Sequence, residues 1–237
     1  MKWTFGIITT GTEQARLLEV IRSIVEEVPE HQIIVVGGEK EGEDHEALVN
    51  VVGNVFHVPF DEKKKDGWIT RKKNLITGYA DHDNICYLHD YVALQPGWLA
   101  GFEEFGEEWL TCMTCVQNAN GSRFRDWCVI YNDAWMKPPI DKEEPPKEHP
   151  PGMLMRYGTT GHERWQYYSG AYFCAKKSVM LEIPLDENRV WGQGEDVQWS
   201  RLAYAKYGPE VFKMNANSSV KFLKQKDPAP WERLPQL

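Results

Sequence analysis

The chain has 237 residues, of which 42% are hydrophobic, enough for one sizeable core, and we expect a single domain. Its net charge of −8 at pH 7 argues against a surface built mainly to hold nucleic acid, while leaving room for a local basic groove. No apolar run reaches the ~18 residues that cross a bilayer, and the amino-terminal apolar stretch is too short for a signal peptide. We therefore expect a cytoplasmic protein, with peripheral association at a membrane left open.

The five cysteines are an odd number in a chain much larger than disulfide-stapled miniproteins. Cys86 and Cys174 lie in apolar runs, which is typical of packed thiols. Cys112 and Cys115 form a lone "CMTC", and no second pair or histidine follows at the spacing of a zinc site. Reduced core cysteines are favoured over a metal or redox pair.

The first forty residues predict a strand, a helix and a second strand. "WTFGIITTG" is β-rich and "QIIVVGG" is a buried strand ended by two glycines. Between them, apolar residues recur at helical spacing: Ala15, Leu18, Ile21, Ile24 and Val25. This pattern is typical of a parallel βαβ unit, and therefore of an open sheet with helices on both faces that binds ligands at the carboxyl ends of its strands.

The middle of the chain continues the alternation of strands and helices. The expected elements are a strand within 50–60, a helix within 66–80, a strand at 84–88, a helix within 96–109, and two strands within 110–133 around a turn at Asn120 and Gly121. Residues 137–152 contain six prolines and cannot form the interior of a helix or sheet. A surface loop is favoured there over a lid that faces an acceptor.

The segment "WGQGEDVQW", residues 191–199, combines a tight turn with an acid pair. Gly192 and Gly194 permit the turn, and Glu195 and Asp196 fall in the first turn of the following helix, where the helix dipole stabilises carboxylates. Helix capping alone would explain the acids, but tryptophans at both ends of the segment indicate a recessed pocket. Further along, Val197, Leu202 and Ala205 are expected to face the core.

Two other segments carry polar groups with a functional pattern. The segment "KKKDGWITRKKN" places six cations within eleven residues of an acidic protein. These cations either form a solvated face or meet an anionic ligand, for which Arg71 and Lys72 are the candidates. Asn74 is expected to hydrogen-bond the backbone. "NICYLHDYVALQPGW" predicts a buried strand that ends in a polar tip of His89, Asp90 and Tyr91.

Together, "FGIITTG…QIIVVGG", "ITRKKN", "YLHDYVALQPGW" and "SGAYFCAKKSVM…WGQGEDVQWS" resemble the nucleotide-sugar glycosyltransferases of the GT-A fold. The layout is similar to family 2, and the last motif to the "WGxGED" of galactosyltransferases. The resemblance covers most of residues 3–226. It implies one α/β domain over 1–237 with an open mixed sheet, a nucleotide-binding part at about 1–98 and an acceptor and catalytic part at about 99–237.

The resemblance also implies roles for single residues. Asp196 would be the general base that takes the proton of an acceptor hydroxyl, with inversion at the sugar, and Glu195 would orient the acceptor. Trp191 would stack on a sugar, with Gly192 and Gly194 beside it. Arg71 and Lys72 would contact the donor diphosphate. The nucleotide would be bordered by the ends of the first two strands: Thr9, Thr10, Gly11, Gly37 and Gly38.

The polar tip departs from the family pattern. Relatives commonly have "LDDDV" here, with the last acid on a divalent metal, whereas this chain has His89 for the first acid and Tyr91 for the last. Tyrosine is a poor ligand for Mg²⁺ or Mn²⁺ at neutral pH. His89 and Asp90 could still hold a metal, which is the favoured interpretation; alternatively Lys224, Arg71 and Lys72 neutralise the diphosphate without one.

The acceptor is open: a glycan, a lipid-linked sugar or another hydroxyl. A modified base of DNA is a less favoured acceptor, supported by the basic cluster and opposed by the net acidity. A third hypothesis is a noncatalytic sugar- or nucleotide-binding module of the same fold, supported by the altered "HDY" tip and opposed by the intact "GED".

Overall fold

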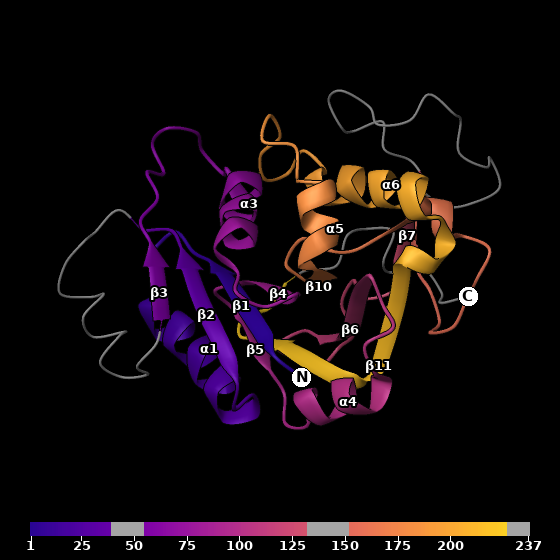
Figure 1. The fold of residues 1–237 in the computed structure, drawn as a ribbon, viewed down its shortest axis with the longest axis horizontal. Helices are drawn as coiled ribbons and strands as arrows, with labels where there is room; N and C mark the ends of the chain where they lie inside the picture. The colour runs from indigo at the N-terminus through magenta and orange to yellow at the C-terminus, as the bar shows by residue number, and fades with distance from the viewer. Residues whose placement is uncertain (39–54, 132–151, 227–237) are drawn as a thin grey trace.

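The computed structural model describes residues 1–38, 55–131 and 152–226. Within these ranges the chain forms a mixed eight-stranded sheet in the order β3-β2-β1-β4-β10-β6-β11-β5, with a small sheet β8-β7-β9 beside it (Figure 1). Most of the Pro-rich segment 137–152 lies outside the described residues. No helix in the described ranges is long and apolar enough to span a membrane.

The first half of the sheet is parallel. β1 (Trp3–Ile8) lies between β2 (His31–Val36) and β4 (Asn84–His89), and β3 (Val55–Val58) pairs with β2. α1 (Gln14–Glu27) connects β1 to β2, and α3 (Ile69–Tyr79) connects β3 to β4. Buried, β-branched strands with helical crossovers are what the amino-terminal pattern predicted.

The second half of the sheet is mixed. β10 (Tyr172–Lys176) runs antiparallel to both β4 and β6 (Thr111–Gln117). β11 (Phe212–Phe222) runs parallel to β6 and antiparallel to β5 (Val92–Leu94). β5 thus follows β4 directly in the chain but lies at the edge of the sheet, where it pairs with β11. The end of β11 therefore lies close to the residues that connect β4 to β5.

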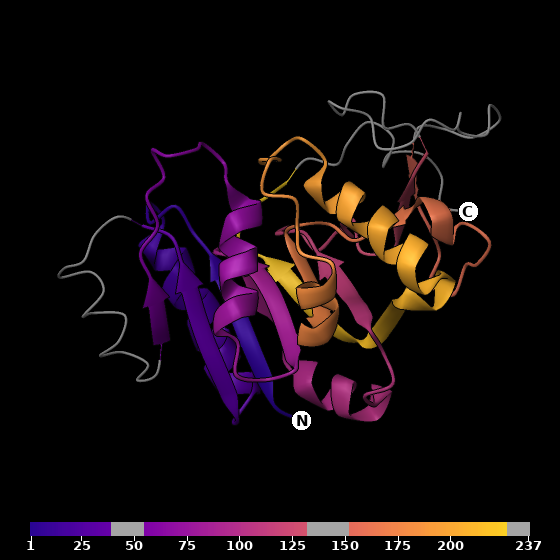
Figure 2. The ribbon, with the colours of Figure 1, turned by 45° about the horizontal axis from the view of Figure 1, so that its top comes forward.

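Helices cover both faces of the sheet. α3, α5 (Lys177–Glu182) and α6 (Glu195–Tyr207) lie on one side, and α1 and α4 (Trp98–Phe105) on the other (Figures 1 and 2). The small sheet consists of β7 (Cys128–Ile130), β8 (Gly152–Leu154) and β9 (Gln166–Tyr167), and short 3₁₀ turns occupy Glu163–Trp165 and Pro209–Val211. The fold is therefore the α/β class with a mixed sheet that the sequence predicted.

The part of the core between the sheet and α4 is aromatic. Trp3 packs edge-on against Trp98 and Phe102, with ring centroids 4.8 and 4.7 Å apart, and stacks on Trp109 at 5.8 Å. Such pairs stabilise a core beyond their buried area. They pack α4 and the segment after it against the start of β1.

Three details differ from the sequence-based expectations. α1 buries Leu17, Val20, Ile21 and Ile24, while Val25 is exposed, because the apolar stripe runs along a neighbouring face of the helix. α6 buries Val197 as expected, but Trp199 and Ala203 face the core where Leu202 and Ala205 were expected.

The expected pair of strands around Asn120 and Gly121 is the third difference. The turn exists, with Gly121 N donating to Asn118 O at 2.8 Å, but the two strands enter different sheets after one isolated bridge. No disulfide joins any of the five cysteines, all of which lie in the described ranges.

Gly6 sets the distance between β1 and α3. A Cβ built on Gly6 would lie 2.2 Å from the side chain of Ile76, which is fully buried. We expect Gly6→Ala to lower the free energy of unfolding by about 1–3 kcal/mol, because overpacking forces the helix outward. Urea unfolding measures the change.

Gly78→Ala is the matched control, because Gly78 lies in α3, the helix that carries Ile76, and its added Cβ meets nothing within 4 Å. We expect that variant to be more stable by about 0.5–1 kcal/mol, since alanine favours a helix over glycine. Equal effects of the two substitutions would contradict the close packing of α3 on β1.

Candidate functional site

The polar residues that follow β1 and β4 meet at one edge of the sheet. Ile8 pairs with His89 in the parallel register, so the residues after them come side by side. Thr9 Oγ1 donates to Asp90 Oδ2 at 2.7 Å, and the backbone N–H of Gly11 donates to Thr9 Oγ1 at 2.9 Å. The carboxyl ends of the strands thus form a fixed polar edge, the usual location of a ligand site in an α/β sheet.

A cavity of about 520 Å³ opens at this edge. It is lined by eight of the residues singled out from the sequence: Thr9, Thr10, Lys72, His89, Asp90, Tyr91, Trp191 and Lys224. Sequence reasoning did not single out Arg16, Asp66 or Lys226, which also line it. We take this cavity, the strand-end cavity, as the candidate site.

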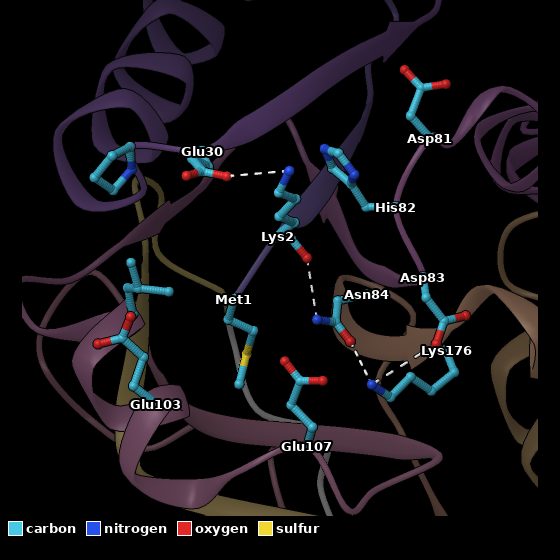
Figure 3. Close-up of a pocket in the computed structure, with 12 residues that line it drawn as sticks. Met1, Lys2, Glu30, Asp81, His82, Asp83, Asn84, Glu103, Glu107 and Lys176 are labelled. Atoms are coloured by element: carbon cyan, nitrogen blue, oxygen red, sulfur yellow. Dashed lines mark hydrogen bonds and ion pairs between the residues drawn. The ribbon is translucent and has the colours of Figure 1, made fainter.

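A larger cavity of about 760 Å³ lies at the opposite edge of the sheet, near the starts of β1 and β4 (Figure 3). Both of its lysines are paired: Lys2 with Glu30, and Lys176 with Asn84 and Asp83. Because it lies at the amino ends of the strands and its cations are neutralised, size alone does not make it the better site.

The two basic candidates on α3 differ in position. Lys72 is buried, donates to Thr9 O at 2.7 Å and forms an ion pair with Glu62. Arg71 does not line the strand-end cavity and pairs with Glu187, with Nη1 and Oε1 3.0 Å apart. Asn74 bonds the backbone of Leu185 in both directions, as expected.

The predicted glycines shape the edge without lining the cavity. A Cβ on Gly37 would lie 1.8 Å from Thr9 O, and one on Gly11 would lie 3.0 Å from Gly38 Cα, so the two strand ends approach through glycine. Gly192 and Gly194 have φ of +80° and +66°, and Gly194 is the amino-terminal cap of α6. The left-handed backbone of this turn orients the acid pair.

Glu195 and Asp196 begin α6, next to the chain segment that precedes β10. Asp196 Oδ2 accepts from the backbone N–H of Gly170 at 2.8 Å, and Oδ1 accepts from that of Val197 at 2.9 Å. A Cβ on Gly170 would lie 3.2 Å from Glu195 Oε1 and 3.3 Å from Asp196 Oδ2. Only glycine therefore fits comfortably between the two acids and the loop.

Lys73 is the cation that faces this pair, and sequence reasoning did not separate it from its neighbours. Its side chain is buried, and Nζ donates to Gly170 O at 2.7 Å. Burial lowers the pKa of Lys73, while Glu195 and Asp196 raise it. Arg71 and Lys73 lie two positions apart and therefore on different sides of the helix, a difference that a charge count cannot resolve.

Glu195 is buried, with 5% of its surface exposed. Burial, together with the neighbouring charge of Asp196, raises the pKa of Glu195 to about 8, although Lys73 lowers it. Two adjacent carboxyl groups in different environments are suited to different tasks, one as a hydrogen-bond donor and the other as a proton acceptor.

His89 ends β4 in a strongly cationic environment. Burial lowers the pKa of His89 well below its usual value, and the charges of Lys73, Lys226, Lys224 and Lys72 lower it further. Its Nε2 is buried and has no hydrogen-bond partner among the described residues. The imidazole is therefore neutral at physiological pH.

The donor set at the tip does not fit a divalent metal. Among the described residues, no three His, Cys, Asp or Glu side chains gather closely enough to hold one. Asp90 Oδ2 is bonded to Thr9, and Tyr91 Oη accepts from Lys226 Nζ at 2.5 Å. The expected metal site at His89 and Asp90 thus lacks further ligands and lies among lysines.

No protein-family model and no curated protein matches the chain by sequence. Solved structures do match its fold. A crystal structure of GalNAc-T7 with UDP, GalNAc and Mn²⁺ aligns with a TM-score of 0.63 at 11% identity, over 99% of this chain and 45% of that one. Residues 1–349 of S. aureus TarS in complex with UDP align with a TM-score of 0.57 at 12% identity, over 96% of this chain and 59% of that one.

These likenesses identify the architecture as the GT-A fold of glycosyltransferases. The chain spans about half the length of the solved chains that it matches. A likeness at this level of identity defines the fold, and the residues of the strand-end cavity must carry any argument about function.

The raised pKa of Glu195 predicts a pH-dependent stability. An unfolded glutamate loses its proton near pH 4.3, whereas the folded protein keeps it to about pH 8, so the folded state binds more protons between these values. The stability contributed by Glu195 is therefore fully present at low pH and falls as pH rises from about 5 to about 8, with a limiting slope of roughly 1.4 kcal/mol for each pH unit.

Urea unfolding at pH 5, 6.5 and 8 measures this effect. We expect the stability of the natural protein relative to Glu195→Gln to decrease across the series, because glutamine does not titrate. Glu104→Gln, at an exposed position of α4, is the control and should give a constant difference. A constant difference for Glu195→Gln would show that Glu195 ionises normally.

Proposed function

We propose that the protein is a glycosyltransferase that moves a sugar from a nucleotide diphosphate sugar to an acceptor hydroxyl. The observation that carries the proposal is the juxtaposition of the cationic strand-end cavity with the acid pair of α6. Trp191, four residues before Glu195, lines the cavity together with Lys226, and the charge of Asp196 raises the pKa of Lys226, so the two features are neighbours. The structures of GalNAc-T7 and TarS with UDP support UDP as the first nucleotide to test.

The chemistry assigned to the site is a displacement at the anomeric carbon with inversion. The acceptor oxygen forms the new bond to that carbon, its proton passes to Asp196, and the bond to the diphosphate oxygen breaks with its electron pair remaining on the nucleotide diphosphate. An alcohol is a weak nucleophile until a positioned carboxylate takes its proton, and the leaving group needs positive charge nearby. Asp196 is held in place by two backbone N–H groups.

Glu195 and Trp191 have supporting roles in the proposal. Protonated Glu195 can donate a hydrogen bond to the acceptor, in agreement with its raised pKa. Trp191 lines the cavity with 69% of its surface exposed, while its backbone N–H is fixed to Gly67 O at 2.8 Å. An exposed ring on an anchored backbone suits stacking on a sugar or base.

Replacement of Asp196 tests the proposed base. We expect Asp196→Asn to lower transfer by about 100-fold or more, because the amide keeps the shape but cannot accept the proton. Transfer is measured as release of nucleotide diphosphate from nucleotide sugars with a panel of glycan, lipid-linked and DNA acceptors. The affinity for UDP, measured by titration calorimetry, should stay within about threefold of the natural protein.

Asp83→Asn is the matched control, since it makes the same change at the opposite edge of the sheet. Its transfer rate should be unchanged. Full activity of Asp196→Asn would remove the residue from the mechanism, and UDP binding without turnover in the natural protein would favour the noncatalytic module.

Removal of the Trp191 ring tests the stacking role. We expect Trp191→Ala to weaken binding of the preferred nucleotide sugar by about tenfold with little change in the unfolding temperature, because the ring is exposed and packs little against the rest of the protein. Thermal shift with and without nucleotide sugar gives both quantities. Tyr157→Ala, at another exposed ring, should leave ligand affinity unchanged; an unaltered affinity in Trp191→Ala would contradict the role.

A further inference from the structure

The end of β11 lies over the tip of β4. The antiparallel pairing of β11 with β5 places Phe222 opposite Val92, and the next hydrogen bond runs from Leu223 N to Tyr91 O at 2.8 Å. The chain bends directly after β11, and Lys224 and Lys226 both reach Tyr91.

Two ammonium groups lie against this one ring. Lys224 Nζ is 4.0 Å and Lys226 Nζ is 4.6 Å from the ring centroid of Tyr91, and Lys226 also donates to Tyr91 Oη at 2.5 Å. Cation–π attraction and this hydrogen bond hold the lysines in place. Tyr91 is itself buried, with 4% of its surface exposed, so it is a rigid support.

The two ammonium groups lie close enough to affect each other. Burial and the charges of Lys224 and Arg125 together lower the pKa of Lys226 to about 8, while Asp196 acts in the opposite direction. Burial and Arg16 lower the pKa of Lys224, while Asp90 and Glu13 raise it. Both lysines and Arg16 line the cavity. Like charges held together at a cavity wall favour an anion in that cavity.

We propose that Lys224 and Lys226, held on the ring of Tyr91, bind the donor diphosphate and neutralise it as it leaves, in place of a divalent cation. The inference rests on the proposed function and names how its donor is held. Tyr91 stands where the resemblance places a metal-binding acid, and its hydroxyl is bonded to Lys226. A dication at this position would be repelled by two ammonium groups and would gain no third ligand from the described residues.

His89 agrees with this arrangement. In a metal site its unpartnered Nε2 would be the ligand, but that atom is buried and lies among cations. A neutral imidazole next to an ammonium pair adds no charge to it. The cavity is thus lined by lysines together with an uncharged histidine.

Titration calorimetry of the full chain with UDP, GDP and inorganic pyrophosphate tests the inference. Each ligand is titrated once with EDTA and once with Mn²⁺. We expect UDP or GDP to bind with affinities that agree within about twofold in the two conditions, and pyrophosphate to compete with it. Transfer activity in EDTA should likewise be retained.

Variants of the two lysines identify the groups that bind. Lys226→Met and Lys224→Met should each weaken binding in EDTA by about tenfold or more, and Lys226→Arg should restore most of the affinity. Lys221→Met, three residues before Lys224 on β11, is the matched control and should bind normally, because Lys221 does not line the strand-end cavity. Thermal unfolding confirms that each variant is folded.

The outcomes separate the inference from the proposed function. Nucleotide binding or transfer that requires Mn²⁺ would overturn the lysine pair and leave the glycosyltransferase intact. Normal binding by both methionine variants in EDTA would also overturn it. If no nucleotide diphosphate and no nucleotide sugar binds in either condition, the proposed function itself fails.

Discussion

The buried ammonium of Lys73 is the constraint on which the arrangement of the site depends. It comes from α3, binds the carbonyl of Gly170 before β10, and faces the two acids that begin α6. A buried lysine is unfavourable without partners, and a buried acid pair is unfavourable without a cation. Each group makes the burial of the other tolerable, so three elements that are distant in the chain are fixed together by charge.

The sequence predicted the parallel half of the fold because its signals are local. Apolar strands, glycine at their ends and helices of suitable length specify a βαβ unit without knowledge of the rest of the chain. The residues alone did not give the strand order of the mixed half, because β11 depends for its pairing on β6 and β5, which are distant in the chain. The buried faces of α1 and α6 shifted for a similar reason, since the packing partner selects among adjacent apolar stripes.

The same difference between local and long-range signals applies to the predicted site residues. Residues at strand ends, such as Thr9 and Asp90, reached the cavity because the topology places every carboxyl end of the parallel strands at one edge. Arg71 and Lys73 have the same charge and lie two positions apart, and only the rotation of α3 decides which one meets the acids. The sequence analysis did not identify Lys226, because Lys226 lies close to Tyr91 only through the pairing of two segments that are distant in the chain.

The loop that carries Trp191 is tied to the loop that precedes α3. Trp191 N bonds Gly67 O, and both Trp68 Nε1 and Lys65 Nζ bond Glu187 O, so the two loops share a seam of hydrogen bonds to the backbone. Figure 2 shows them rising beside α3 at the same end of the molecule. Trp191 lies only four residues before Glu195, and these hydrogen bonds therefore restrain the cavity rim and the segment that leads into the acid pair together. A displacement of either loop would break hydrogen bonds that the other loop also needs, so the rim and the start of α6 keep their positions together.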